Sequence, residues 1–221
     1  MFLATAHATG LAVLGIDFGD LALILQTHVH SGHFGNTAGV AQRARCPVSY
    51  HLADQSLADR GDNGPLQGIG LRGRLLARLF GHLSFDPVAA DVTAADGMRL
   101  DDFGVAGTVL HTPGHTAGSI ALILDSGDAI VGDTLMGGYA GGAVFPTRPN
   151  FHSFADDLPA AMESLDKVLA ATRGTLFVGH GGPLCHEDVA RWRATHGADV
   201  RSSPHPPGDP ANLSSGGSCW S

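Results

Sequence analysis

Apolar residues follow helical spacing in some segments of the chain and form short continuous runs in others. Helical spacing predicts helices at residues 3–15, 36–45, 70–82, 154–171 and 186–196. Continuous apolar runs bounded by turn residues instead predict buried strands, at LALILQ (21–26), PVSY (47–50) and TLFVG (175–179). The chain therefore mixes helices and strands over most of its length.

The pattern changes between Val88 and Gly132. The β-type runs TVLHT, SIALIL and DAIVG are separated there by the turn signals ADG, PGH and DSGD, which predicts an antiparallel sheet with hairpins. After Gly197 the sequence is rich in Pro, Gly and Ser, so we expect a disordered tail at 198–221. One globular domain over residues 1–197 would precede it.

Composition and charge exclude two classes of protein. No stretch approaches the about 20 uncharged apolar residues of a membrane span, and the apolar start lacks a basic region and is interrupted by Asp17 and Asp20. These features indicate no membrane segment and a cytoplasmic location. The net charge of -8 argues against nucleic-acid binding, and Arg72, Arg74 and Arg78 fit a solvated helix face.

A histidine cluster stands at the end of the first predicted strand. The stretch QTHVHSGHFGN, residues 26–36, carries His28, His30 and His33, a spacing that should arise by chance only about 0.04 times in a chain of this composition. Positions i and i+2 of an extended segment face the same side, so His28 and His30 could hold one ion together. His33 lies further round, at the following turn.

Three more polar residues stand where predicted strands end in glycine-rich turns. They are His115 in HTPGHTAGS, Asp133 in VGDTL and His180 in FVGHGGP. Imidazoles with a carboxylate suit zinc or another first-row metal, and one carboxylate can bridge two ions. The cysteines form no C-x-x-C pair, so they indicate no thiolate zinc site.

The ordered series H-x-H-x-x-H, T-P-G-H-T-x-G-S, G-D-T and G-H-G resembles the metallo-β-lactamase fold hydrolases, in particular the glyoxalase II-like branch. This resemblance covers residues 3–195 and implies an α/β fold, an αββα sandwich with metals at the sheet edge. It implies that His28, His30 and His115 hold a first metal, that His33 and His180 hold a second, and that Asp133 is shared. Zinc is the expected metal, as one or two ions, and iron or manganese would also suit.

The resemblance implies hydrolysis of a small ester, thioester or lactone by a metal-activated water, on a small-molecule substrate. Two alternatives stay open. The protein could be a metal-binding remnant with impaired activity, or a mononuclear iron dioxygenase acting on a persulfide through His28, His115 and Asp133. An association of several copies of the chain is compatible with each of these functions.

Two departures from the family pattern bear on these expectations. The family's motif is H-x-H-x-D-H, and Gly32 stands where the aspartate would ligate the second metal, so that ion should bind more loosely. Family members also carry about 30 to 40 further residues of β-strand before the helix expected at 3–15. We therefore expect a chain truncated at its N-terminus or one whose true start lies upstream.

Two further histidines and an arginine are weaker candidates. FPTRPNFH, residues 145–152, follows Asp133, and as a loop it could place Arg148 and His152 against the substrate. His111 precedes TPG, and we expect it to pack against its neighbours or to support a metal ligand through a hydrogen bond.

Overall fold

The computed structural model describes residues 11–196. Residues 11–13 are helical, but the rest of the helix expected at 3–15 lies mostly outside the described residues. The tail expected at 198–221 lies wholly outside them.

The N-terminal part forms a parallel three-stranded sheet in the order β1-β2-β3. Its strands are β1 (Ile24–Leu25), β2 (Val48–Tyr50) and β3 (Val92–Thr93). The helices around it are α2 (Ser31–Phe34), α3 (Thr37–Ala44) and α4 (Gln55–Arg60). The strands expected at 21–26 and 47–50 and the helix expected at 36–45 are confirmed.

The second sheet has five strands in the order β10-β9-β6-β5-β4. Their bounds are β4 (Gly107–His111), β5 (Ile120–Leu124), β6 (Ala129–Gly132), β9 (Thr175–Val178) and β10 (Leu184–Cys185). The expected antiparallel hairpins β4–β5 and β5–β6 are confirmed, but β6 and β9 pair in parallel. The expectation that this sheet begins near Val88 is wrong, because β3 pairs with β2 in the other sheet.

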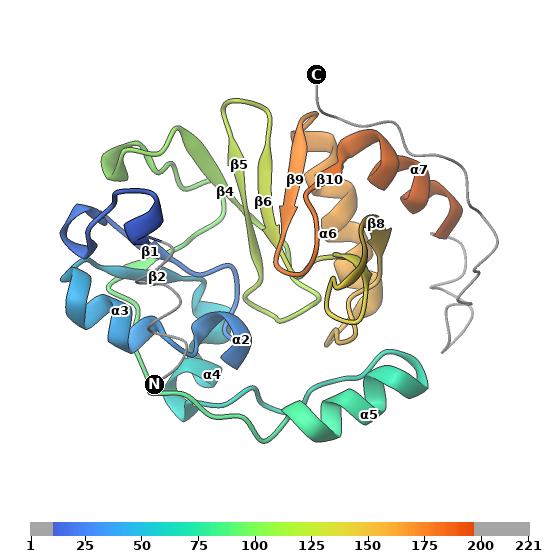
Figure 1. Ribbon diagram of the computed structural model, residues 1–221, viewed down its shortest axis with the longest axis horizontal. Helices are drawn as coiled ribbons and strands as arrows, with labels where there is room; N and C mark the ends of the chain where they lie inside the picture. Colours follow the sequence, from blue (N-terminus) through green and yellow to red (C-terminus); the bar gives the residue numbers. More distant parts are fainter. Residues whose placement is uncertain (1–10, 197–221) are drawn as a thin grey trace.

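Helices cover the outer sides of the two sheets (Figure 1). On the C-terminal side these are α6 (Leu158–Ala171) and α7 (His186–His196). Successive side chains of β5 point to opposite faces of the sheet and enter two separate hydrophobic clusters. Ile120 and Leu122 pack towards the first sheet, and Ala121 packs towards α6. The expected αββα arrangement follows from this alternation, because β5 packs one face against α6 and the other against the first sheet, although Ile130 of β6 and Phe177 of β9 stay 40% and 42% exposed.

Helix α6 begins four residues later than the sequence pattern indicated. The Asp157 carboxylate accepts a hydrogen bond from the Ala160 N–H and caps the helix, and a proline occupies its first turn. Residues 154–157 are therefore free to lie in an extended connection beside the functional site.

Two further elements flank the sheets. Strands β7 (Met136–Tyr139) and β8 (Val144–Asn150) form a hairpin, so the expectation of a loop at 145–152 is wrong for most of that segment. Helix α5 (Gly70–Phe80) confirms the helix expected at 70–82. Leu71, Leu75 and Leu79 on this helix are nevertheless exposed, by 81%, 68% and 67%. Their side chains form an apolar stripe open to solvent.

Short 3-10 turns complete the described chain, at Phe18–Asp20, Leu52–Asp54 and Asp101–Phe103. Between residues 11 and 196, every helix is too short or too polar to cross a bilayer.

Candidate metal centre

The first histidines lie in the connection from β1 to α2. His30 is the residue before α2, with extended backbone angles of -126° and 150°, and His33 lies within that helix. The extended backbone before the helix brings the rings of His28 and His30 to 5.1 Å of each other, and α2 places the ring of His33 4.3 Å from that of His28.

The remaining candidates come from the five-stranded sheet. His115 lies in the turn between β4 and β5, where Gly114 has a φ of +136° and a side chain on it would strike Ala161 of α6. Asp133 follows β6 and His180 follows β9. Since these two strands are parallel neighbours, their ends meet at the same edge of the sheet.

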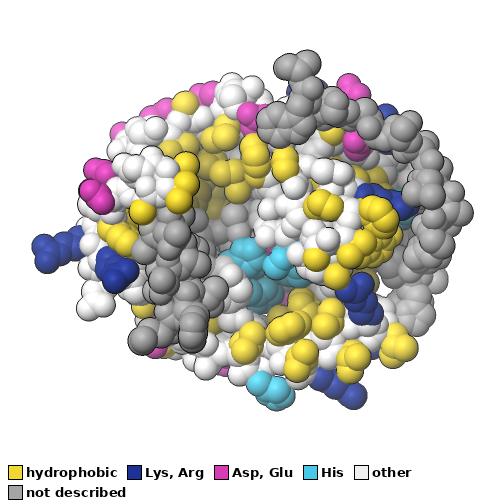
Figure 2. Space-filling view, viewed as in Figure 1, with side chains coloured by type: hydrophobic (Ala, Val, Ile, Leu, Met, Phe, Trp, Pro, Cys, Tyr) yellow, Lys and Arg dark blue, Asp and Glu magenta, His cyan; other side chains and the backbone are white. Residues whose placement is uncertain are grey.

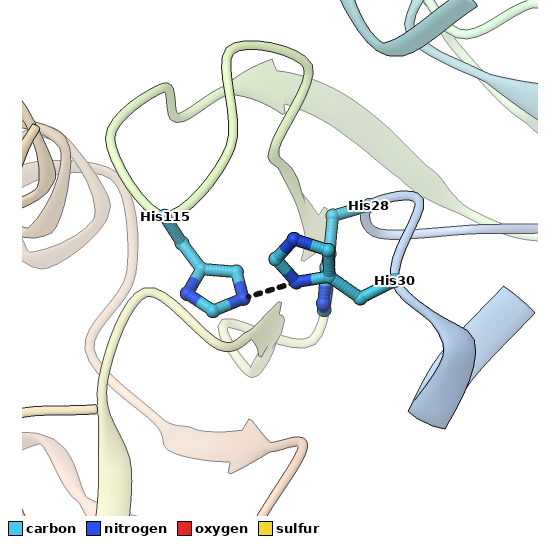
Figure 3. A group of neighbouring side chains, drawn as sticks. All are labelled: His28, His30 and His115. Atoms are coloured by element: carbon cyan, nitrogen blue, oxygen red, sulfur yellow. Dashed lines mark hydrogen bonds between the residues drawn. The ribbon is translucent and has the colours of Figure 1, made fainter. Parts of the chain in front are cut away.

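The Asp133 carboxylate is the centre of the cluster. Five imidazole Nε2 atoms surround its Oδ2 atom, at 3.1 Å for His33, 3.2 Å for His152, 3.4 Å for His180, 3.6 Å for His115 and 3.7 Å for His28. His30 points its Nδ1 at His115 Nε2, 3.0 Å away, as Figure 3 shows. The structure therefore brings all six expected ligands together and adds His152.

The histidines lie in a hollow between apolar side chains over α5 and over the β7–β8 hairpin (Figure 2). His28 and His115 are buried, whereas the His180 side chain is 37% exposed. The cluster is thus deep on the side of the first three ligands and open to solvent at His180.

Burial controls the charge of the cluster. It lowers the pKa of His28 and of His115 well below the ordinary value. Repulsion from a neighbouring imidazole, His115 for His28 and His152 for His115, lowers each pKa further. Burial also lowers the pKa of His30 to about 4. Burial alone would raise the pKa of Asp133, but the surrounding imidazoles together hold it well below its usual range. At neutral pH the buried rings of His28, His30 and His115 are therefore neutral beside an anionic carboxylate, whereas the hydrogen bond to Asp133 raises the pKa of the more exposed His180.

Asp54, which sequence reasoning missed, supports the ligand loops through hydrogen bonds. Its side chain is buried and accepts hydrogen bonds from Val29 N (3.0 Å), Thr116 Oγ1 (2.8 Å) and Gly118 N (2.6 Å). Val29 separates His28 from His30, and Thr116 follows His115. One carboxylate therefore fixes the two loops that carry the first three ligands. Its position after β2 gave no local signal of this role.

Gly32 lies in α2 with helical backbone, and a side chain on it would meet no atom within 4 Å. It borders a cavity of about 350 Å³. The lining residues are Leu25, Gln26, Thr27, Ser31, Gly32, His33 and Asn36. By contrast, a side chain on Gly179 would strike Asp133 and His33, so glycine is required there.

The weaker candidates lie in different places. Arg148 is half-buried on β8. His111 is outside the cluster: its Nε2 bonds the Ala117 carbonyl at 2.9 Å and its ring stacks on His51 at 3.9 Å.

Comparisons with known proteins identify the family and the fold. A family model described as the metallo-beta-lactamase superfamily matches residues 3–180. An uncharacterized protein of Mycobacterium tuberculosis is 31% identical over 121 residues, which are 52% of this chain and 51% of that protein. A hydroxyacylglutathione hydrolase of Halorhodospira halophila is 28% identical over 167 residues, 69% of this chain and 53% of that enzyme. The chain thus spans about half the length of these relatives.

Solved structures show the same fold. A metallo-beta-lactamase family protein from Thermus thermophilus superposes with a TM-score of 0.61 at 23% identity, covering 88% of this chain and 67% of that one. A protein crystallised in a di-iron-bound form superposes with a TM-score of 0.59 at 25% identity, covering 84% of this chain and 81% of that one.

Proposed function

The chain belongs to the metallo-beta-lactamase superfamily, and from this premise we propose that it is a metal-dependent hydrolase of a small ester, thioester or lactone. The observation that carries the proposal is the set of five imidazole Nε2 atoms within 3.7 Å of one buried carboxylate oxygen. One carboxylate oxygen cannot accept a hydrogen bond from all five rings at once, so burying this many polar nitrogens costs free energy unless a cation satisfies those left without a partner.

The donor set fits a metal on two further observations. Among the described residues, His28 Nε2 and Asp133 Oδ1 are buried atoms without a hydrogen-bond partner. The lowered pKa values of the buried histidines keep their nitrogens unprotonated, which is the form that binds metal. His28, His30 and His115 would hold one ion, and the remaining donors would hold a second that shares Asp133.

A bound zinc, iron or manganese ion would supply a Lewis acid and lower the pKa of a coordinated water towards about 7. The chain itself supplies position and shielding. The buried ligands exclude water from one side, while the open side at His180 admits a substrate. Arg148, half-buried on β8, is our candidate for a contact to a polar substrate group.

The apolar walls of the hollow favour a substrate with an apolar group. Leu71, Leu75 and Leu79 are exposed on α5, and Val144 and Phe145 of β8 are exposed by 45% and 61%. Figure 2 shows apolar side chains over both elements, on either side of the histidines. Apolar side chains exposed on both sides of a functional site commonly mark a binding surface. The names of relatives such as the hydroxyacylglutathione hydrolases support a thioester within this class.

The test is reconstitution. Protein stripped with a chelator is loaded separately with zinc, iron or manganese and assayed on ester, thioester and lactone panels. We expect turnover only with metal, and its loss in Asp133→Asn but not in the exposed-residue control His82→Ala. If no metal supports hydrolysis of any panel member, the proposal is wrong. Oxygen uptake with a persulfide in the iron form would favour the dioxygenase instead.

A further inference from the structure

His152 reaches the metal centre from an element that contributes no other ligand. It follows β8, and its Nε2 atom lies 3.2 Å from Asp133 Oδ2, closer than that of His28 or His115. Its side chain is only 9% exposed. Its ring lies edge-on to His115, with centroids 4.5 Å apart, and 5.4 Å from that of His180. This histidine is therefore part of the cluster and not of its rim.

The other ring nitrogen of His152 is held as that of a metal ligand should be. The Phe154 carbonyl oxygen accepts a hydrogen bond from His115 Nδ1 at 2.9 Å and lies 3.2 Å from His152 Nδ1. Metal-bound imidazoles generally donate their second N–H to such a group, which aims the first nitrogen at the ion. One carbonyl orients both rings.

A bound cation would determine which ring nitrogen of His152 carries the proton. Its Nδ1 also lies 3.2 Å from Phe154 N–H, so without a cation the ring can accept that bond and donate Nε2–H to Asp133. With a cation bound beside Asp133, His152 would offer the Nε2 lone pair, and its Nδ1–H would donate to the Phe154 carbonyl.

The number of donors decides which ion His152 serves. A first ion would have four donors, from three histidines and Asp133, whereas a second would have only His33, His180 and the shared Asp133. We propose that His152 Nε2 is the fourth protein ligand of the second ion. This inference rests on the proposed function, because it requires the cluster to bind metal.

The backbone around His152 is fixed by the segment that leads into α5. Ile69 N donates to the Ser153 carbonyl at 2.9 Å, and Ala155 N donates to the Gln67 carbonyl at 3.0 Å. These bonds on either side of Phe154 hold the shared carbonyl, and with it the ring of His152, in place.

The test is zinc titration of the metal-free full chain against a chromophoric chelator. Wild type is compared with His152→Ala, with His152→Gln, which keeps bulk but is a poor ligand, and with the exposed-residue control His82→Ala. We expect wild type and control to bind two ions. Both His152 variants should bind the first ion as tightly as wild type and the second about 100-fold more weakly. Removing a group that only supports a ligand weakens metal binding by about 10-fold to 100-fold, and removing a ligand should cost at least the upper value.

Circular dichroism and thermal melting without metal check that each variant folds, and the glutamine variant serves if the alanine variant does not. If wild type binds two ions and the folded variants bind both as tightly, the role of His152 is wrong while the proposed function stands. If the folded variants lose both ions equally, the assignment to the second ion is wrong. If wild type binds no metal, both proposals fail.

Discussion

Asp133 determines the character of this site, because a single carboxylate serves both proposed ions. Two dications beside one anionic side chain leave a large positive charge that the neutral imidazoles do not cancel. A second carboxylate at the site should therefore strengthen the binding of metal, and Gly32 is where the chain has room for one.

Gly32→Asp is the direct experiment. Its backbone is helical and its surroundings are open, so aspartate should cost little strain. We expect the second zinc to bind at least about 10-fold more tightly, since each added negative ligand lowers the charge of the centre. The gain should be larger in the His152→Ala background, where a donor is missing. Unchanged affinity in both backgrounds would show that position 32 does not face the second ion.

Asp54 tests a residue that supports ligands without touching the proposed metal. In Asp54→Asn the amide NH2 replaces one carboxylate oxygen and faces a backbone donor, Gly118 N. We expect a loss of about 1 to 3 kcal/mol in the free energy of unfolding and weaker binding of the first metal. Chemical denaturation and zinc titration measure these effects. Asp102→Asn, at an exposed site, is the matched control.

At the scale of elements, the contact between α5 and residues 153–155 positions the second ligand set. Gly73 of α5 is buried, and a side chain on it would strike the Ser153 carbonyl. We expect Gly73→Ala to displace this connection, to lower stability and to weaken the second metal. Gly39→Ala in α3 is the control, because a side chain there meets nothing and should stabilise the helix by up to about 1 kcal/mol. Equal behaviour of the two variants would contradict the positioning role.

The apolar stripe of α5 makes a prediction about substrates. If Leu71, Leu75 and Leu79 contact an acyl chain, each methylene that becomes buried adds at most about 0.8 kcal/mol, or roughly fourfold in kcat/KM. A series of thioesters of increasing chain length measures this slope. Leu75→Glu should flatten it while leaving the rate on the shortest substrate unchanged. A flat slope in wild type would remove α5 from the binding surface.

At the scale of the whole molecule, the proposed metals connect the two sheets. His28, His30 and His33 follow a strand of the three-stranded sheet, whereas Asp133 and His180 follow strands of the five-stranded sheet. A bound ion would therefore hold together loops that come from both sheets. We expect metal to contribute to the stability of the complete fold for this reason.

Metal removal should therefore lower the melting temperature. An ion at about 1,000 times its Kd stabilises the native state by about 4 kcal/mol, equivalent to roughly 10 °C for a chain of this size. Thermal melting with and without a chelator measures the shift. Asp133→Asn should melt at the same temperature in both conditions, and a chelator-independent melt of wild type would contradict metal-linked stability.

Several features could be predicted from the sequence because their signals are local. Turn residues fixed the β4–β5 and β5–β6 hairpins, and helical spacing located α3, α5, α6 and α7. The six residues predicted as ligands could be singled out because they stand in short motifs beside small residues, after predicted strands. The Gly32 departure was also visible, since it is a single position within a short motif.

Only the tertiary structure decided the features that depend on residues far apart in the chain. The parallel pairing of β6 with β9, the three donors around Asp54 and the approach of His152 to Asp133 join segments separated by many residues. Local spacing carries no record of such contacts, because they arise when whole elements pack. The sequence thus indicated His152 only as a weaker candidate for substrate contact, and packing alone directs its ring towards a buried carboxylate.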